Sequence, residues 1–574
     1  MNSSAMNEST AKNVLDIEHL RVTFATDQGE VKAVDDVALS VAPGEVVAIV
    51  GESGSGKTVT AKSILGLLPE TALASGAVLV SGHNVVSIPA RELRRVRGRD
   101  VSMVFQEPST ALNPVYTVGW QIAEGLRAHR AAQSAMGGGS RVSRKEARTA
   151  AIEALRKVGI PEPEKRVDYY PHQFSGGQKQ RVVIAAALAL NPALIVADEP
   201  TTALDVTVQA EILELLREVR DTFGTAIVLI THNMGVVADL ADRVVVMYHG
   251  KVVEEASAER LFSAPQQEYT QKLLAAVPHL GRYSASAGRT ERAHQDAPVL
   301  VEARDLVIEY PGRLGQSGFR AVNEVSFTIS AGEVFGLVGE SGSGKTTIGR
   351  AIAGLNRTTG GSLTVLGHEM RDFRERTFKP LRKDIGFVFQ DPAASFNPQL
   401  TMGECVAEPL QVHTTDSPVQ VRKRVGDLLE AVQLPRGFAD RYPHELSGGQ
   451  RQRASLARSL ALNPKLLIAD EPTSALDVSV QAKVLELFKE IQQEFGFAAL
   501  FVSHDLAVVD QLADWVGVLY RGTLVEQGIG SRVMSNPQAE YTKRLIASLP
   551  VPDPRQQAAR RQERRQLSRG DSAA

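Results

Sequence analysis

The sequence predicts a duplicated α/β fold in which each half holds a parallel β-sheet covered by helices. Three observations support this prediction. The motif VGESGSGKT occurs at 50–58 and again at 338–346. Apolar runs such as ALIVAD (193–198) and AIVLITH (226–232) lack the alternation of half-exposed strands, which is typical of strands buried on both faces. Longer helical patterns separate these runs, as the connections between parallel strands require.

The duplication extends over most of the 574 residues. MVFQEPSTALNP (103–114) returns as FVFQDPAASFNP (387–398), and ADEPTTALDV (197–206) returns as ADEPTSALDV (469–478). The first copy carries an extra segment within 131–146, which we expect to be an inserted surface loop because it is rich in glycine, serine and charge. The expected organisation is a flexible N-terminus (1–13), a first domain (14–280), a linker (281–297), a second domain (298–550) and a basic, disordered tail (551–574).

The composition excludes several classes of protein. The net charge of −2 lacks the basic excess of a nucleic-acid binder, so no nucleic-acid partner is expected. Cys405 is the single cysteine, which rules out a disulfide framework and a cysteine-ligated iron–sulfur cluster, and we expect it to be buried. No stretch reaches the ~18 apolar residues of a membrane span, and the N-terminus lacks a secretory pattern. A cytosolic protein that reaches a membrane only through partners is expected.

The repeated glycine-rich motif is a P-loop. Its backbone N–H groups wrap phosphates, its lysine reaches the β- and γ-phosphates, and its threonine ligates Mg²⁺. Each copy lies between a predicted strand and a predicted helix, such as EVVAIVG (45–51) before the first, which makes chance occurrence negligible. The residues assigned to ATP binding are Gly51, Ser53, Gly54, Ser55, Gly56, Lys57 and Thr58 in the first copy and Gly339, Ser341, Gly342, Ser343, Gly344, Lys345, Thr346 and Thr347 in the second.

Two acids follow a buried strand in each copy, in LIVADEP (194–200) and LLIADEP (466–472). The first acid, Asp198 or Asp470, can hold Mg²⁺ together with the P-loop threonine, Thr58 or Thr346. The second acid can orient or deprotonate the attacking water. The catalytic glutamates are therefore predicted to be Glu199 and Glu471.

The order P-loop, glutamine, SGGQ, DEP, ALD and histidine, present twice, resembles the nucleotide-binding subunits of ABC transporters over nearly the whole chain. The resemblance implies two tandem P-loop NTPase domains of the ABC type, each with a RecA-like core and a helical subdomain. It also implies functional roles. Gln106 and Gln390 would contact Mg²⁺ and relay movement to a membrane partner. His232 and His504 would contact the γ-phosphate.

The same resemblance implies that the two domains pair head to tail, so that each SGGQ covers the γ-phosphate held by the P-loop of the other domain. Asp205 and Asp477 match the D-loop of the family, and Phe24 and Tyr310 resemble the aromatic residue that stacks on adenine. The SGGQ residues expected to contact ATP are Ser175, Gly176, Gly177 and Gln178 in the first copy and Ser447, Gly448, Gly449 and Gln450 in the second. Both sites retain their catalytic groups, so two hydrolytic sites are expected.

The segments APQQEYTQKLLAAVP (264–278) and NPQAEYTKRLIASLP (536–550) resemble the oligopeptide/dipeptide importer ATPases, a group that includes nickel and glutathione systems. The resemblance implies an ATPase that uses ATP and Mg²⁺ at the cytoplasmic face of the inner (plasma) membrane. Its implied partners are two permease subunits and an extracytoplasmic substrate-binding protein. Di- or oligopeptides are the leading cargo, with nickel chelates, glutathione or another small solute as alternatives. A tandem ABC protein acting on ribosomes, or one acting in DNA repair, is a more distant alternative.

Overall fold

The structure is a computed structural model, which describes residues 13–26, 29–134, 142–202, 204–278, 280, 297–312, 318–473 and 476–571. Residues 1–12, nearly all of the predicted linker (281–296) and residues 135–141 of the predicted inserted loop lie outside this description. The chain divides into two compact units, the first formed by 1–275 with 550–562 and the second by 276–549 with 563–574. Each half is described below by itself.

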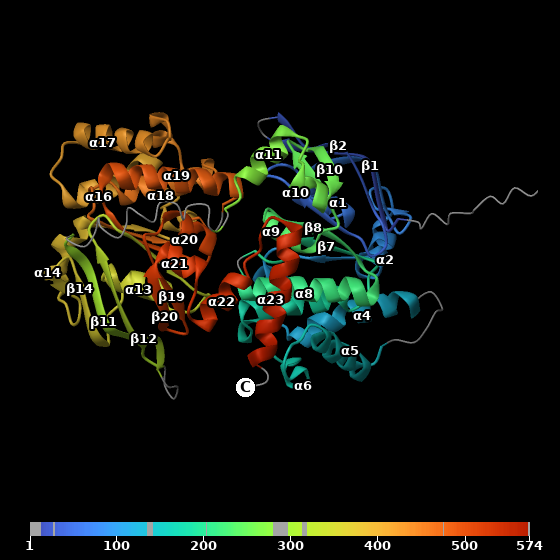
Figure 1. Ribbon diagram of the computed structural model, residues 1–574. Helices are drawn as coiled ribbons and strands as arrows, with labels where there is room; N and C mark the ends of the chain where they lie inside the picture. Colours follow the sequence, from blue (N-terminus) through green and yellow to red (C-terminus); the bar gives the residue numbers. More distant parts are fainter. Residues whose placement is uncertain are drawn as a thin grey trace, which may run out of the picture. The chain divides into compact units, whose positions relative to one another are not determined.

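The first unit contains two sheets (Figure 1). A six-stranded sheet has the order β10-β9-β3-β8-β7-β6, in which only β10 is antiparallel to its neighbour, and a four-stranded antiparallel sheet has the order β2-β1-β4-β5. The strands are β1 (Leu15–Thr26), β2 (Gly29–Val41), β3 (Val46–Val50), β4 (Ala72–Val80), β5 (His83–Asn84), β6 (Val101–Val104), β7 (Leu194–Asp198), β8 (Ala226–Ile230), β9 (Arg243–Tyr248) and β10 (Lys251–Ser257).

The helices of the first unit connect these strands. Those that matter for the site are α1, which begins at Lys57 of the P-loop, α7, which begins at Gly176 of SGGQ, and α8 and α9, which follow the strands β7 and β8. The helices are α1 (Lys57–Ile64), α2 (Ala90–Arg99), α3 (Pro108–Ala111), α4 (Val118–Ser134), α5 (Arg144–Lys157), α6 (Pro163–Arg166), α7 (Gly176–Leu188), α8 (Val206–Phe223), α9 (Met234–Leu240), α10 (Ala258–Ser263) and α11 (Glu268–Ala275).

The second unit repeats the arrangement with the sheet orders β16-β17-β18-β13-β19-β20 and β12-β11-β14-β15. Its strands are β11 (Val299–Tyr310), β12 (Phe319–Ser330), β13 (Val334–Val338), β14 (Gly360–Val365), β15 (His368–Glu369), β16 (Ile385–Val388), β17 (Leu466–Asp470), β18 (Ala498–Ser503), β19 (Trp515–Tyr520) and β20 (Thr523–Ile529). Its helices are α13 (Lys345–Ile352), α14 (Glu375–Phe378), α15 (Pro392–Ser395), α16 (Met402–His413), α17 (Pro418–Ala431), α18 (Gly448–Ser459), α19 (Val478–Phe495), α20 (Leu506–Leu512), α21 (Gly530–Ser535) and α22 (Glu540–Ala547).

The parallel core predicted from the apolar runs is confirmed. Every residue of β3, β7 and β8 is buried, because helices such as α1 and α9, together with the antiparallel sheet, cover the parallel sheet. The antiparallel sheet was not predicted. Its strands β1 and β2 contain polar residues and bulges that blur the alternation, yet their inward residues complete one hydrophobic core with β3, β7 and β8.

The C-terminal region differs from the predicted disordered tail, because residues 554–571 form the helix α23 (Pro554–Asp571). Its first turn is capped by Asp553, whose Oδ1 accepts hydrogen bonds from the backbone N–H groups of Arg555 (2.8 Å) and Gln556 (3.1 Å). Arginine and glutamine have good helix propensity, and this signal was missed because the segment has no apolar period. Cys405 is buried, as predicted. Within the described residues, no helix is long and apolar enough to cross a membrane.

Candidate ATP-hydrolysis sites

The P-loop of each unit connects the central strand to the following helix through glycines that no other residue could replace. Gly51 and Gly56 have φ values of 149° and 100°. A Cβ at these positions would lie 2.2 Å from the carbonyl oxygen of Met247 and 2.5 Å from that of Ala33. Gly339 and Gly344 of the second loop are equally constrained. The loop is therefore held tightly against the neighbouring strands, which fixes the direction of its backbone N–H groups.

The P-loop lysines lie over their own loops. Lys57 Nζ donates hydrogen bonds to the carbonyl oxygens of Gly51 (2.7 Å) and Glu52 (2.8 Å). Lys345 makes the same two bonds, at the same distances, to Gly339 and Glu340. Both lysines are buried, so each ammonium group is fixed in position at the start of a helix, where anions bind.

A hydroxyl and a carboxylate come together at the end of each P-loop. Thr58 Oγ1 lies 3.5 Å from Asp198 Oδ1, and Thr346 Oγ1 donates to Asp470 Oδ1 at 3.0 Å. Burial and the neighbouring Glu199 raise the pKa of Asp198 to about 6. A divalent cation would remove this cost of ionisation, and hydroxyl and carboxylate oxygens are ligands that Mg²⁺ prefers. The donor set therefore fits the predicted Mg²⁺ site.

Glu199 lies one residue beyond β7 with a left-handed φ of 47°, a conformation that costs energy outside glycine and is concentrated at functional sites. Its backbone N–H donates to the carbonyl of Ile230 at 2.8 Å. Its carboxylate accepts from Gln106 Nε2 (2.7 Å) and lies 3.0 Å from His232 Nδ1. Residues predicted from three distant motifs thus meet at one carboxylate.

The second unit builds the same constellation. Glu471 also has a φ of 47°, and its carboxylate accepts from Gln390 Nε2 at 3.0 Å and lies 3.3 Å from His504 Nδ1. Burial is the largest single effect on Glu471 and raises its pKa, but the hydrogen bond and charge of His504, the charge of Lys345 and the hydrogen bond from Gln390 together lower the pKa below its usual value. The pKa of Glu199 is lowered in the same way, with His232 as the main favourable partner. Both glutamates are therefore ionised near neutral pH, as a group that orients or deprotonates water must be.

The two glycines of each SGG have different environments. A Cβ on Gly177 would lie 2.4 Å from Val208 Cγ1 of α8, and Gly449 meets Val480 of α19 at the same distance. Gly176, in contrast, has nothing within 4 Å. The second glycine allows two helices to pack closely, whereas the first leaves space through which a ligand can approach the helix N-terminus.

The serine and glutamine of SGGQ cap their helix. Ser175 Oγ accepts from the Gln178 backbone N–H at 3.3 Å, and Gln178 Oε1 accepts from the Ser175 N–H at 3.2 Å. Ser447 and Gln450 form the same capping box on α18. Gln178 and Gln450, predicted to contact ATP, thus have a structural role within their own units. The preceding Phe174 and Leu446 are both buried, so the difference between them is one of packing.

The predicted adenine-stacking residues differ in environment between the two units, whereas the predicted D-loop residues do not. Tyr310 is exposed, and its hydroxyl accepts from Asn356 (3.0 Å) and lies 3.5 Å from Thr347 beside the second P-loop. Phe24 instead packs partly buried against the core. Asp205 and Asp477 occupy the N-cap positions of α8 and α19.

A tyrosine contact with each P-loop was missed by the sequence analysis. The hydroxyl of Tyr269 accepts from the backbone N–H of Glu52 at 3.1 Å, and Tyr541 accepts from Glu340 at 3.4 Å. Each tyrosine ring lies 4.2 Å from a second tyrosine, Tyr248 in the first unit. The repeated EYT of 268–270 and 540–542 is a sequence signal for this contact, beyond its part in the family resemblance.

A second missed contact lies beside Glu199. Thr202 Oγ1 donates to Glu199 Oε2 at 2.9 Å, and so adds a third partner to the carboxylate. The hydroxyl in TTALD recurs as a serine in TSALD, which could have indicated its role.

The comparison with known families decides which class of nucleotide-binding protein this is. The family model for ABC transporters matches residues 34–202 and 322–474. The chain belongs to the ABC transporter family. A second model, for the C-terminal region of oligopeptide/dipeptide transporters, matches 253–299 and 525–572. Both resemblances predicted from the motifs are thereby confirmed, and the chain is an ABC-type ATPase with two fused domains.

Relatives of this ABC protein include the glutathione import ATP-binding proteins of Escherichia coli (strain K12) and Salmonella typhimurium (strain LT2). Each is 44% identical over 96% of this chain and 92% of the relative. A solved dimeric ATP-binding cassette bound to ADP and Pi is 32% identical and covers 40% of this chain and 98% of its own, with a TM-score of 0.37.

Proposed function

We propose that this chain energises a bacterial importer of small peptides, with glutathione as the first cargo to test. The observation that carries the proposal is the 44% identity, over 96% of the chain, to proteins named for glutathione import. This identity favours glutathione, which the sequence analysis gives as an alternative cargo, over di- and oligopeptides in general, which it gives as the leading cargo. Cargo is selected by the binding protein and the permease, and this chain supplies the energy.

Each hydrolytic site would combine elements of both domains, as the family resemblance implies. Lys57 and Glu199 would act with Ser447 of the other domain, and Lys345 and Glu471 with Ser175. The open space at Gly176 is consistent with a role in approaching a phosphate. In each site, Mg²⁺ would be held by the P-loop threonine and by the aspartate that precedes the catalytic glutamate, and it would neutralise phosphate charge during hydrolysis.

The proposed permease contacts lie beside the two glutamines. In the second unit, a groove of about 320 Å³ is lined by Phe389, Val412 and Arg458 among others. Arg458 belongs to α18, and its guanidinium donates to the Ser395 carbonyl at 2.6 Å. A helix inserted in the groove would therefore touch residues that connect the glutamine loop to the SGGQ helix.

The corresponding surface of the first unit is aromatic. Tyr116 and Trp120 stack with ring centroids 4.1 Å apart, and Phe105 is also exposed. The second copy has Leu400 and Glu404 in place of the stacked pair. The two surfaces differ in chemistry, as expected if they bind two different permease subunits and hold the chain at the cytoplasmic face of the inner membrane.

Uptake and co-purification test this proposal. Cells lacking the gene should lose ATP-dependent uptake of labelled glutathione and regain it with the wild-type gene, but not with the variant Glu199→Gln plus Glu471→Gln. The protein should purify with the permease subunits from membranes. Unchanged glutathione uptake in the deletion strain, with loss of dipeptide or nickel uptake, would reassign the cargo. Association with ribosomes and never with membranes would contradict the importer.

A further inference from the structure

A short C-terminal segment belongs to the first unit although it follows the second unit in the sequence. This segment, residues 550–562, comprises the start of α23 and the residues before it. We name it the strap. It is folded internally, because the buried Gln557 side chain accepts from the backbone N–H of Val551 at 2.9 Å.

The strap contacts α9 near its start. A Cβ placed on Gly235 would lie 2.7 Å from the backbone carbon and oxygen of Pro550, so only glycine permits this approach. Gly235 follows His232 by three residues, and its backbone N–H is held by the side chain of Asn233 at 3.0 Å. The contact is thus made at the turn that leads from His232 into α9.

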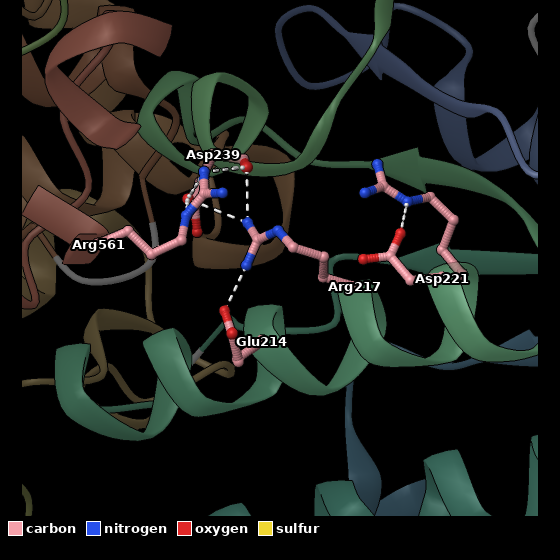
Figure 2. Close-up of polar contacts among 6 residues, drawn as sticks. Glu214, Arg217, Asp221, Asp239 and Arg561 are labelled. Carbon is pink, nitrogen blue, oxygen red and sulfur yellow. Dashed lines mark hydrogen bonds and ion pairs between the residues drawn. The ribbon is translucent and has the colours of Figure 1, made fainter. Parts of the chain in front are cut away.

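The strap also contacts the end of α9 through an ionic cluster (Figure 2). Arg561 donates to Asp239 Oδ1 from Nε (3.1 Å) and Nη2 (2.8 Å), and to the Asp239 carbonyl oxygen at 3.0 Å. Arg217 of α8 donates to the same carbonyl at 2.7 Å and is itself bonded to Glu214. The Asp239 side chain is only 1% exposed, so this is a desolvated, charge-assisted cluster of the strong kind.

Three residues of this contact surface are replaced in the second copy. The residues equivalent to Gly235, Asp239 and Arg217 are Ala507, Gln511 and Lys489. The glycine that admits Pro550 and the carboxylate that receives Arg561 therefore occur in the first copy only. The surroundings of His232 and His504 consequently differ, although a glutamine and a histidine contact the glutamate in both units.

We infer that the strap fixes α9, and through it His232, so that hydrolysis by the glutamate of the first unit depends on a contact that the second unit does not have. Arg561 is then a positioning residue for His232, whose Nδ1 lies 3.0 Å from Glu199 Oε1. The two ATP sites would be chemically alike but unequally supported. This inference rests on the hydrolytic roles proposed above for Glu199 and His232.

The test measures steady-state ATP hydrolysis by the purified full chain. In the Glu471→Gln background, where turnover depends on Glu199, Arg561→Ala should lower kcat by at least about fivefold with little change in KM for ATP, because small displacements of a catalytic group reduce turnover without removing binding contacts. In the otherwise wild-type chain, whose second site is unaffected, the loss should approach about half of kcat. Arg561→Lys should recover part of the loss. Gly235→Ala, which displaces Pro550, should reproduce it. The matched control is Arg555→Ala, which removes the same charge from the same helix, where the Arg555 guanidinium forms an exposed pair with Glu259 at 3.6 Å.

The site that is affected can be identified in single-site backgrounds. With Glu471→Gln, the remaining turnover depends on Glu199 and should fall when Arg561→Ala is added; with Glu199→Gln, adding Arg561→Ala should change nothing. An unchanged kcat for Arg561→Ala in the otherwise wild-type chain would overturn the inference, as would equal losses in the two backgrounds or an equal loss in Arg555→Ala. Normal hydrolysis by the doubly substituted Glu199→Gln, Glu471→Gln chain would instead contradict the assigned sites.

Discussion

Replacing Asp198 by asparagine should stabilise the ligand-free first unit while weakening its use of Mg²⁺. Burial raises the pKa of this carboxyl from 3.8 to about 6, so the folded protein disfavours the charged form. About two pKa units correspond to about 3 kcal/mol at pH 7. The substitution removes the charge and retains an oxygen that can accept from Thr58 Oγ1, and Asp198 is 5% exposed, so little of this energy is screened by solvent.

The gain from Asp198→Asn depends on pH in a defined direction. A carboxyl whose folded pKa is raised contributes stability below its unfolded pKa and loses that contribution as pH rises through the folded value. The wild-type protein therefore bears the full cost above about pH 6. At pH 5 the same pKa values leave about half of this destabilising cost. The advantage of the variant should be larger at pH 7.5 than at pH 5.

Unfolding of the first unit can be monitored separately by measuring hydrogen exchange of the β7 backbone amides as the temperature is raised. In the absence of nucleotide, a gain of about 3 kcal/mol should raise its midpoint by roughly 6–10 °C at pH 7.5. Added Mg²⁺ and ATP should stabilise the wild type more than the variant. An unchanged midpoint at pH 7.5, or a gain that is greater at pH 5, would refute the reasoning.

Two further substitutions separate packing from ligand contact. Gly177→Ala forces a methyl group against Val208 and should lower stability by about 1–3 kcal/mol in a denaturant titration, whereas Gly176→Ala should leave stability nearly unchanged and lower ATP hydrolysis; equal destabilisation by both would contradict the distinction. Tyr269→Phe removes the acceptor of the Glu52 N–H, a loss of about 1 kcal/mol, and should weaken ATP binding about fivefold in a fluorescent-nucleotide titration. Tyr248→Phe, which retains the ring contact, should bind normally, and equal losses in both would discount the hydrogen bond.

The sequence predicted the elements that repeat and have local signatures. The buried strands before Gly51 and Glu199 are continuous apolar runs, and the P-loop and DEP motifs carry their chemistry in adjacent residues. The meeting of Gln106, Glu199 and His232 could be anticipated only through the family resemblance, because the three belong to different elements that the sheet brings together.

Other features depended on tertiary contacts that no local pattern encodes. The cap formed by Ser175 and Gln178 has a sequence signature, but the family resemblance assigns SGGQ to ligand contact alone. The strap was missed because Arg561 lies in a charged, aperiodic segment, and its partner Asp239 is buried 322 positions away. A closer comparison of the two copies, noting Gly235 against Ala507, could have indicated that the surroundings of the histidines differ.

The proposal of two shared ATP sites is tested most directly by combining Ser175→Arg with each catalytic substitution. If Ser175 serves the site of Lys345 and Glu471, then Ser175→Arg with Glu471→Gln damages one site twice, and the other site remains intact. Ser175→Arg with Glu199→Gln damages both. Steady-state ATPase activity should therefore be clearly higher in the first combination than in the second, and Ser447→Arg should give the reverse order. The opposite order for Ser175→Arg would contradict the head-to-tail arrangement and show that each SGGQ serves its own P-loop.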